Sequence, residues 1–497
     1  MSEKIIKELA GIIQNKDKPD QILLRDHNIA IGLRDDRGAG IIVGATTKGC
    51  VLGYDKKLLS IIKGEKHSQN NKPVEVDPAE IYEKLYGKKP DESQLQDFIP
   101  KLKSILPYEF TPTEGKLLYC GIDIKDIVKA HKDTFGFEEV SYLLLTGKLP
   151  TEEQLGIFED LLKSKRCLPE GFKDRLVYQL TSKDMMNTLQ TAVDNIYELD
   201  HNPNSTDIED VTRHSIELIA KFPAIIAYAY HGMKHKYEGK ELKMTIPPDR
   251  FSYAQYFLSM LRKGKPFTDE EAHILDMFLM LHAEHGGGNN STFTVRVVSS
   301  SETDTYSAIS SGLASLKGHL HGGANEKVIN MMKFIKNDVR DWKDKDEVFG
   351  YLCRWLNKEV GDKSGKLYGL GHAVYTKSDP RAIILREEAK KLAKIKSRSN
   401  EFELLDLVGQ LAPKAFEKIK GNKKIISPNV DFYSGFVLDC LEIPPELYTP
   451  LFAMARVSGW LSHRLEQLIQ NRIIRPAYFE LVPEKAYVPI EERQSTK

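Results

Sequence analysis

The sequence predicts a mainly helical protein that begins with a small segment of strands and turns. From about residue 108 almost to the end, apolar residues recur at helical spacing, as Ile309, Leu313 and Leu316 do. In residues 27–55, short Ile and Val runs alternate instead with Gly and Asp, a pattern typical of short strands and turns. We therefore expect a long helical region preceded by a different N-terminal segment.

Helix starts in this region carry a local signature. Two capping boxes, in which a hydroxyl and a long polar side chain satisfy backbone N–H groups reciprocally, pair Thr151 with Gln154 and Thr268 with Glu271. Ser301 with Asp304 is a shorter variant, and the helix that it opens is predicted to stop near Gly318. This places His321 in the turn after a helix C-terminus.

Composition limits the kind of partner and compartment. The 497 residues include 71 Lys and Arg and 71 Asp and Glu, for a net charge of +0, so no global field favours nucleic acid or an anionic membrane. The five cysteines are odd in number, widely spaced and never in a CxxC pair. They argue against a disulfide framework and a thiolate metal site, and they favour a reducing compartment.

The chain shows no pattern of a membrane span or of a targeting signal. Residues 218–230 are the most apolar stretch, but Lys221 and Pro223 interrupt it, so we expect a buried helix. Residues 1–20 are amphipathic and include acidic residues, and they lack the apolar run of a secretory signal. We therefore expect a cytoplasmic protein.

The segment LHAEHGGGNNST ends a predicted helix at His285 and continues into three glycines. Glycine permits a sharp turn and the close approach of a ligand, but the same pattern also ends an ordinary helix. A zinc site is the alternative chemistry, because His282 with His285 and His319 with His321 are closely spaced. No third ligand at fixed spacing and no HExxH motif accompanies these pairs.

Two further histidines stand in turns that contain glycine. His321 precedes two glycines in GHLHGGANE, and His372 follows Gly-Leu-Gly in LYGLGHAVYTKSDPRA. That Gly-Leu-Gly lacks the third glycine of a dinucleotide fingerprint, and no strand precedes it. Arg381 follows a proline that starts the next predicted helix, with Asp379 as its N-cap. Taken alone, each turn also fits an ordinary solvated loop.

A carboxylate and an arginine stand among apolar neighbours. Asp431 lies between Val430 and Phe432 in SPNVDFYSG, and burial there would raise its pKa and make it a usable base. Arg456 interrupts the apolar helix LFAMARVSGWLSH with no acidic residue within a helical turn. A buried guanidinium keeps its charge, so it would need a substrate carboxylate or a distant acid. Arg475, in NRIIRPAYF, says little by itself.

Taken in order, these segments resemble the citrate synthase family. The motifs HGGGNNSTFTVR, LKGHLHGGANEKV, GLGHAVYTKSDPRA, NVDFYSG and LFAMARVSGWLSHRLEQ occur in family order with family-like spacing. Upstream, GKLLYCGIDIKDI and FEEVSYLLLTGKLP resemble its N-terminal helices. The resemblance covers residues 108–482, which is most of the chain.

The resemblance implies a mainly helical, citrate synthase-like two-domain fold, normally in a homodimer, that closes around the substrates. The small helical domain would comprise residues 321–435. The large helical domain would comprise residues 108–320 and 436–497. Residues 1–107 would form a small N-terminal extension of strands and turns, for which the resemblance implies no role.

Catalytic roles follow from the resemblance position by position. Asp431 would remove a proton from the methyl group of acetyl-CoA while a neutral His321 donates to the thioester oxygen. His372 would polarise and then protonate the carbonyl of oxaloacetate, and hydrolysis of the citryl thioester would release CoA. The resemblance thus implies an acyltransferase that works in the tricarboxylic acid cycle. This chemistry requires no metal or redox cofactor.

Substrate binding follows from the same resemblance. The carboxylates of oxaloacetate would be bound by His285, Arg381 and Arg456, together with Arg475 supplied by the neighbouring subunit. Arginine suits this task because its planar fork pairs with a carboxylate through two hydrogen bonds. Asn289 and Ser291 stand where the family supports its histidine turn.

Three alternatives stay open at this point. A 2-methylcitrate synthase would use propionyl-CoA with the same residues, and one extra methylene changes binding by only about 1 to 3 kcal/mol. A zinc-dependent hydrolase would use the paired histidines instead. A non-catalytic relative that senses CoA is disfavoured because His321, His372 and Asp431 are all retained.

Overall fold

The structure, a computed structural model, divides into two compact units. It describes residues 2–14, 115–371, 377–421, 426–470, 472–475 and 486–493, together with the backbone of 29–34 and 40–45. The first unit comprises Met1–Gln21 with Pro112–Ile473, and the second comprises Ile22–Thr111 with Ile474–Lys497. His372 lies outside the described residues.

The second unit contains a two-stranded antiparallel sheet. Its strands are β1 (Ile29–Arg34) and β2 (Gly40–Ala45), and a short helical turn, η4 (Ile490–Glu492), lies near the C-terminus of the chain. Ile29 pairs with Ala45 at one end of the sheet. The Ile and Val residues of these strands favour extended backbone, so the strands expected in the N-terminal segment are confirmed.

The first unit is a helical body. Up to the His321 turn its elements are α1 (Ser2–Gln14), β3 (Leu118–Tyr119), β4 (Ile122–Asp123), α5 (Ile124–Ala130), α6 (Phe137–Thr146), α7 (Glu152–Ser164), α8 (Phe172–Arg175), η1 (Leu176–Leu180), α9 (Met185–Ile196), η2 (Tyr197–Leu199), α10 (Ile208–Glu238), α11 (Tyr253–Leu261), α12 (Asp269–His282), α13 (Asn290–Ser299) and α14 (Thr305–Lys317). After it come α15 (Ala324–Asp338), α16 (Lys345–Leu356), α17 (Pro380–Ile395), α18 (Ser399–Lys420), α19 (Val430–Cys440), η3 (Pro445–Leu447) and α20 (Tyr448–Gln470). The predicted helical region is confirmed.

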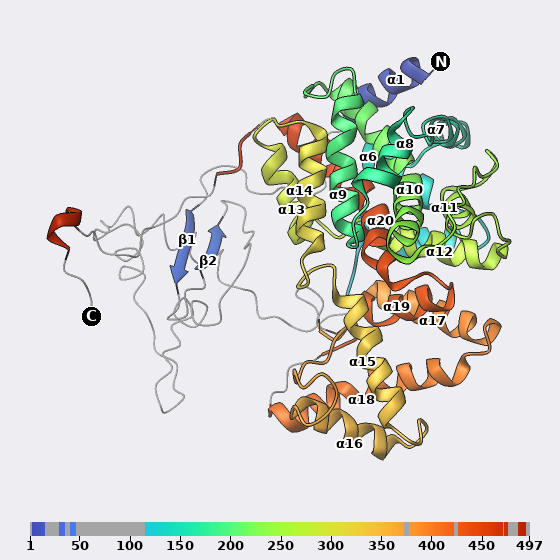
Figure 1. Ribbon diagram of the computed structural model, residues 1–497, viewed down its shortest axis with the longest axis vertical. Coiled ribbons are helices and arrows are strands. Elements are labelled where there is room, and N and C mark those ends of the chain that lie inside the picture. The colour runs from blue at the N-terminus through green and yellow to red at the C-terminus, as the bar shows by residue number, and fades with distance from the viewer. Residues whose placement is uncertain are drawn as a thin grey trace. The chain divides into compact units, whose positions relative to one another are not determined.

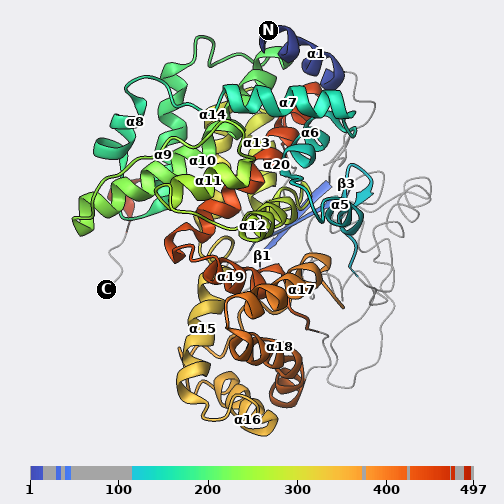
Figure 2. The ribbon, with the colours of Figure 1, turned by 90° about the vertical axis from the view of Figure 1, so that its right-hand side faces the viewer.

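Helices α10 and α20 lie at the centre of one helical group (Figures 1 and 2). Helix α10 contacts α1, α7, α9 and α11. Helix α20 contacts α6, α12, α13 and α14, and α10 and α20 also contact each other. Residues 218–230 lie inside α10 with Lys221 and Pro223 buried, which confirms the expected buried helix. Within the ranges that the structure describes, no helix is long and apolar enough to cross a membrane.

The N-terminal helix α1 is amphipathic and joins this helical body. Ile6, Leu9 and Ile13 are buried, while Lys4 and Glu8 are exposed and approach each other to 3.9 Å. α1 contacts α10 and α6 through its apolar side. Residues 2–14 therefore belong to the helical unit, because the burial of that side stabilises so short a helix.

Capping boxes form where the sequence indicates them. Thr151 and Gln154 begin α7, and Thr268 and Glu271 begin α12, each pair with both reciprocal hydrogen bonds. A third box, not predicted, begins α11 with Ser252 as the cap. Each box replaces hydrogen bonds that the first turn of a helix otherwise lacks.

The predicted start of α14 is wrong. Asp304, not Ser301, caps the helix and accepts a hydrogen bond from the backbone N–H of Ser307. The reason lies in the preceding helix, because the Ser301 hydroxyl donates to the carbonyl of Val298 and helps to end α13. The predicted end of α14 is confirmed, with Gly318 as the C-cap.

Helices α15 to α19 form a second group (Figures 1 and 2). α16 and α17 pack on α18, and α15 and α17 pack on α19. Contacts of α12 with α17 and of α15 with α20 join the two groups. The second group occupies nearly the same residues as the predicted small domain, 321–435, and that domain division stays a prediction.

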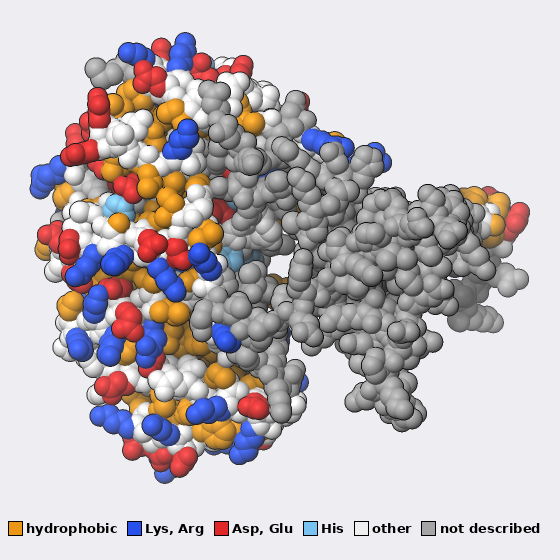
Figure 3. Space-filling model, turned by 180° about the vertical axis from the view of Figure 1, so that it is seen from behind, with side chains coloured by type: hydrophobic (Ala, Val, Ile, Leu, Met, Phe, Trp, Pro, Cys, Tyr) orange, Lys and Arg blue, Asp and Glu red, His pale blue; other side chains and the backbone are white. Residues whose placement is uncertain are grey.

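The surface in Figure 3 carries side chains of both charges, interspersed over the described elements. Along the described helices, several pairs of opposite charge lie one helical turn apart, such as Lys163 with Glu159 at 3.4 Å and Lys234 with Glu238 at 2.6 Å. Such pairs contribute only about 0.3–0.5 kcal/mol each. This face therefore presents no field of a single sign, as the balanced composition leads us to expect.

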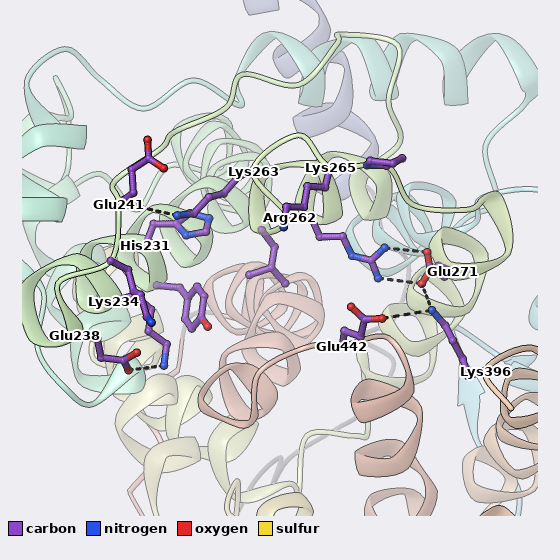
Figure 4. A pocket seen from close by; sticks show the side chains of 14 residues that line it. His231, Lys234, Glu238, Glu241, Arg262, Lys263, Lys265, Glu271, Lys396 and Glu442 are labelled. Atoms are coloured by element: carbon purple, nitrogen blue, oxygen red, sulfur yellow. Dashed lines mark hydrogen bonds and ion pairs between the residues drawn. The ribbon is translucent and has the colours of Figure 1, made fainter. Parts of the chain in front are cut away.

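A cluster of charges joins the two helical groups (Figure 4). Glu271 of α12 accepts two hydrogen bonds from Arg262, at 2.9 and 3.0 Å, and one from Lys396 after α17, at 2.6 Å. Burial alone would raise the pKa of Glu271, but the hydrogen bonds from Arg262 and Lys396 outweigh it and hold the pKa at about 2. An ionised Glu271 therefore ties the end of α17 to the start of α12.

Replacing Glu271 by Gln should destabilise the protein through the lost charge alone. Glutamine keeps the capping box, as Gln154 and Gln255 do in α7 and α11, but it leaves Arg262 and Lys396 without their carboxylate. We expect the free energy of unfolding at pH 7 to fall by about 3 kcal/mol, the cost of breaking a buried ion pair. Urea denaturation of the two proteins measures this difference.

The pH dependence of that loss of stability distinguishes the effect of the missing charge from the effect of the changed side-chain shape. Because the pKa of Glu271 is depressed in the folded protein, its contribution is complete above about pH 5 and is lost as the pH falls toward 2. The loss in E271Q should thus be smaller at pH 4 than at pH 7. Thr268→Ala, which breaks the box and keeps the ion pairs, should cost about 1 kcal/mol at both values. An equal loss for E271Q at both would contradict the charge explanation.

Candidate active site

The His285 turn is held by the residue that precedes it. α12 ends at His282, not at His285 as predicted, because Oε1 of Glu284 accepts hydrogen bonds from the backbone N–H groups of His285, at 2.9 Å, and Gly286. These N–H groups therefore donate to the Glu284 side chain and not to the carbonyls of the last turn of α12, so the helix does not continue. Gly286 has φ +86°, a left-handed conformation that favours glycine.

Glu284 is held in turn by a buried chain of polar side chains. Its Oε1 lies 3.2 Å from Nε2 of His463, and Nδ1 of His463 lies 2.8 Å from Nη1 of Arg296. A guanidinium only donates, so Nδ1 of His463 accepts and its Nε2 carries the proton that is donated to Glu284. Burial alone would raise the pKa of Glu284, but His463 and then Arg456 hold it at about 2. An ionised carboxylate therefore stands behind the His285 turn.

His321 lies in the turn after α14 and contacts α13. Its Nε2 is 3.0 Å from the hydroxyl of Ser291, and that hydroxyl donates to Oδ1 of Asn289 at 2.9 Å and accepts from Nε1 of Trp460 at 3.2 Å. Burial, followed by the positive charge of Arg456, lowers the pKa of His321 to about 4. The imidazole is therefore neutral at pH 7 and has one nitrogen with a hydrogen to donate.

Asp379 organises the start of two helices. As the sequence predicts, it caps α17, and its Oδ1 accepts from the backbone N–H of Arg381 at 3.0 Å. Its carboxylate also pairs with the Arg381 side chain, at 3.1 Å from Nε and 2.8 Å from Nη2. Finally, its Oδ2 accepts from the backbone N–H of Val430 at 3.1 Å. One buried carboxylate thus fixes Arg381 next to the first turn of α19.

Asp431 stands in that first turn of α19. Asn429 caps the helix and accepts from the backbone N–H of Asp431 at 3.0 Å. Asp431 keeps some exposed surface as a residue, but its carboxyl is packed closely enough that burial raises its pKa to about 6, against the opposing charge of Arg381. The carboxylate is therefore ionised at pH 7 and is a stronger base than an ordinary aspartate.

Arg456 is fully buried in α20 with most of its hydrogen-bonding capacity unused. Its Nε donates to the carbonyl of His282 at 2.7 Å, and its guanidinium lies over the ring of Phe452 at 4.6 Å. Nη1 and Nη2 are buried and have no hydrogen-bond partner among the residues that the structure describes. Burial lowers the pKa of Arg456 to about 10, so it is still charged at pH 7. Such a guanidinium is ready to bind an anion.

Electrostatic contacts place these groups around one site. The charge of Arg456 affects the pKa values of His321, Asp431 and Glu284, and the charge of Arg381 also affects that of Asp431. Of the other predicted site residues, His372 lies outside the described residues. Arg475 is exposed and belongs to the second unit.

The histidine pairs that suggested a zinc site do not lie among further metal-binding side chains in the described ranges. His282 is buried, stacks on Phe278 at 4.0 Å between ring centres, and donates from Nδ1 to the Phe278 carbonyl at 2.7 Å. His319 is exposed. Over the described ranges, no three His, Cys, Asp or Glu side chains are grouped so that they could hold a metal ion. The pairs His282 with His285 and His319 with His321 are therefore not part of a metal-ligand cluster in those ranges.

Sequence reasoning missed the residues that hold the turns from behind. Arg296, His463 and Trp460 act through contacts with residues more than 160 positions away in the chain. Only Glu284 gave a local signal. A carboxylate directly after a helix is opposed by the negative end of the helix dipole, so its presence there indicates specific hydrogen-bond donors.

The chain is similar to known proteins along the whole helical region. A family model, "Citrate synthase, C-terminal domain", matches residues 104–477. The citrate synthase of Haloferax volcanii is 37% identical over 388 residues, which cover 76% of this chain and 93% of that protein. The 2-methylcitrate synthase of Shewanella oneidensis is 33% identical over 382 residues, which cover 76% of this chain and 92% of that protein.

Solved structures agree with this match. Citrate synthase of Thermoplasma acidophilum, solved in a ternary complex with carboxymethyl coenzyme A and oxaloacetate, has a TM-score of 0.64 at 30% identity. The match covers 77% of this chain and 95% of that chain. Citrate synthase of Pyrobaculum aerophilum has a TM-score of 0.63 at 31% identity, covering 76% and 90%. Sequence and fold together show that the chain belongs to the citrate synthase family and is an acyltransferase of the Claisen-condensing type.

Proposed function

We propose that this protein is a citrate synthase, which condenses acetyl-CoA with oxaloacetate and water to give citrate and CoA. The observation that carries the proposal is the buried guanidinium of Arg456, whose terminal nitrogens lack partners among the described residues, next to a carboxylate of raised pKa, Asp431. A dicarboxylate substrate supplies the missing anion, and Asp431 supplies the base. Relatives named citrate synthase support the same substrate pair.

The reaction begins with enolisation. Asp431 takes a proton from the methyl carbon of acetyl-CoA, and the C–H electron pair forms the enol double bond while His321 donates a proton to the thioester oxygen. For His321 to donate from Nδ1, the Ser291 hydroxyl must turn its one hydrogen from Oδ1 of Asn289 to Nε2. The hydroxyl is placed for this, because it lies 3.0 Å from Nε2 and is held by Trp460.

Carbon–carbon bond formation and hydrolysis follow. The enol carbon attacks the ketone of oxaloacetate, whose oxygen is polarised and then protonated by His372, and the enol O–H returns its proton to His321 as the thioester carbonyl re-forms. Water next attacks the citryl thioester, the C–S bond breaks, and CoA leaves as a thiol with a proton from that water. No step changes an oxidation state overall, and side chains supply the proton transfers, so we propose that no metal or redox cofactor takes part.

We propose that His285, Arg381 and Arg456 bind oxaloacetate, with Arg475 supplied by a second subunit of a homodimer. Arg456 has the capacity for a bidentate contact, whereas Arg381 is held in a fixed position by its pair with Asp379. The helices α15 to α19 would form the closing small domain, residues 321–435. The large domain would comprise residues 108–320 and 436–497.

Acetyl-CoA is preferred over propionyl-CoA in this proposal, and a thiol-release assay tests the preference. With oxaloacetate and no added metal, the purified protein should release free thiol from acetyl-CoA. We expect kcat/KM for propionyl-CoA to be lower by about 10- to 200-fold, the range that one methylene group supports. The opposite order would make the protein a 2-methylcitrate synthase, and no thiol from either substrate would refute both.

Asp431→Asn should remove the base without changing its shape. We expect kcat to fall by about 100- to 10,000-fold, the usual contribution of a general base, with the affinity for oxaloacetate nearly unchanged. In the wild type, kcat/KM should rise with pH through about 6, where Asp431 becomes ionised. Circular dichroism of the variant checks the fold, and D431N activity within tenfold of wild type would exclude Asp431 as the base.

Arg456→Met should separate substrate binding from stability. Methionine fills the space of a guanidinium that hydrogen-bonds no acid, and Glu284, which its charge attracts, keeps His463 as a partner, so we expect the free energy of unfolding to stay within about 1 kcal/mol or rise. KM for oxaloacetate should rise about 100-fold, because a charged hydrogen-bond pair of about 3 kcal/mol is lost.

The matched control is Arg296→Met, which removes another fully buried arginine. Arg296 pairs with Glu466 at 3.1 Å, so its loss takes the guanidinium from a buried carboxylate and should cost about 3 to 5 kcal/mol of stability. Denaturation and steady-state kinetics are measured on both variants. If R456M were as unstable as R296M and bound oxaloacetate normally, Arg456 would have a structural role.

A further inference from the structure

Asn325 is a buried polar side chain to which the mechanism above gives no role. It is 2% exposed and is the second residue of α15, four positions after His321. α15 packs on α19, the helix whose first turn carries Asp431. The side chain therefore lies between the His321 turn and the Asp431 turn.

The surroundings of the amide determine its orientation. With its oxygen toward α19, the amide would set that oxygen 2.8 Å from Oδ1 of Asp431, although both atoms only accept hydrogen bonds. With its nitrogen toward α19, it donates to Oδ1 of Asp431 at 2.8 Å and to the hydroxyl of Ser434 at 2.7 Å. The second orientation satisfies both ends of the amide.

We propose that Asn325 is a positioning residue for the base, holding Oδ1 of Asp431 so that Oδ2 takes the substrate proton. This inference rests on the proposed role of Asp431. One oxygen of the carboxylate receives the amide hydrogen, and the other stays available for the bond to hydrogen that forms as the methyl C–H bond breaks. A carboxylate fixed in this way loses less freedom when the substrate arrives.

The amide also acts on the ionisation of Asp431. Burial raises the pKa of Asp431 to about 6, Arg381 and Arg456 lower it, and Asp379 raises it. A hydrogen bond to the charged form works with the two arginines, because it favours the carboxylate over the carboxylic acid. Asn325 thereby offsets part of the cost of burying the base.

Two substitutions at this position test the inference. Asn325→Leu keeps the size and removes the hydrogen bonds, and Asn325→Asp keeps the shape and adds a like charge. We expect N325L to lower kcat by about 10- to 100-fold with KM for both substrates within about threefold. The acidic limb of kcat/KM should move to higher pH by about one unit in N325L and by more in N325D.

The matched control is Ser434→Ala, which removes the other partner of the same amide and leaves Asp431 unaltered. A purely structural role of Asn325 would lower stability in N325L and S434A alike and leave the pH limb in place. An N325L limb that coincides with that of the wild type, or an equal shift in S434A, would overturn the inference. If N325L does not fold, the acidic limb of kcat/KM in N325D is compared with that of the wild type instead, and a limb that does not move would overturn the inference.

The same series separates this inference from the proposed function. Activity retained in D431N would refute Asp431 as the base, and the role of Asn325 would fall with it. Activity lost in D431N but normal in both Asn325 variants would refute the role of Asn325 alone.

Discussion

A fully buried arginine normally meets an acid, as Arg296 meets Glu466 and Arg381 meets Asp379. In Arg456, by contrast, the two terminal nitrogens have no hydrogen-bond partner in the described part of the chain. Burying a charge that no acid hydrogen-bonds costs several kcal/mol, which the attraction of the ionised Glu284 and the packing of α20 among α6, α10, α12, α13 and α14 must offset. In the proposed function the fold keeps this cation in place for a ligand, and the other groups of the site take their ionisation states in its field.

Burial moves the pKa values of two groups of the site in opposite directions, whereas the field of Arg456 lowers both. His321 is lowered to a pKa of about 4, while Asp431 is raised to about 6. A base and a neutral hydrogen donor are thus available together at neutral pH, without exchanging protons with each other. The carboxylates of Glu284 and Asp379 serve differently, since both are engaged by backbone N–H groups and hold the turns that carry the site.

Local chemistry could be predicted from the sequence, and long-range contacts could not. The capping boxes at Thr151 and Thr268 follow from residues within one turn, and the lack of an acid near Arg456 was visible in its own helix. The start of α14 was mistaken because Ser301 and Asp304 both suit a cap, and the Ser301 hydroxyl instead donates to the Val298 carbonyl at the end of α13. The Glu284 support joins segments far apart in the chain, which no local pattern reveals.

The ionisation states also determine how the site responds to acid. His321 is neutral where Asp431 is mostly ionised, so these two groups set an acidic limit and no alkaline one. Arg456 stays charged through the neutral range, because its pKa of about 10 lies well above it. In the proposed mechanism, acid therefore acts on the chemical step by protonating the base, while the cation proposed to bind the dicarboxylate stays in place.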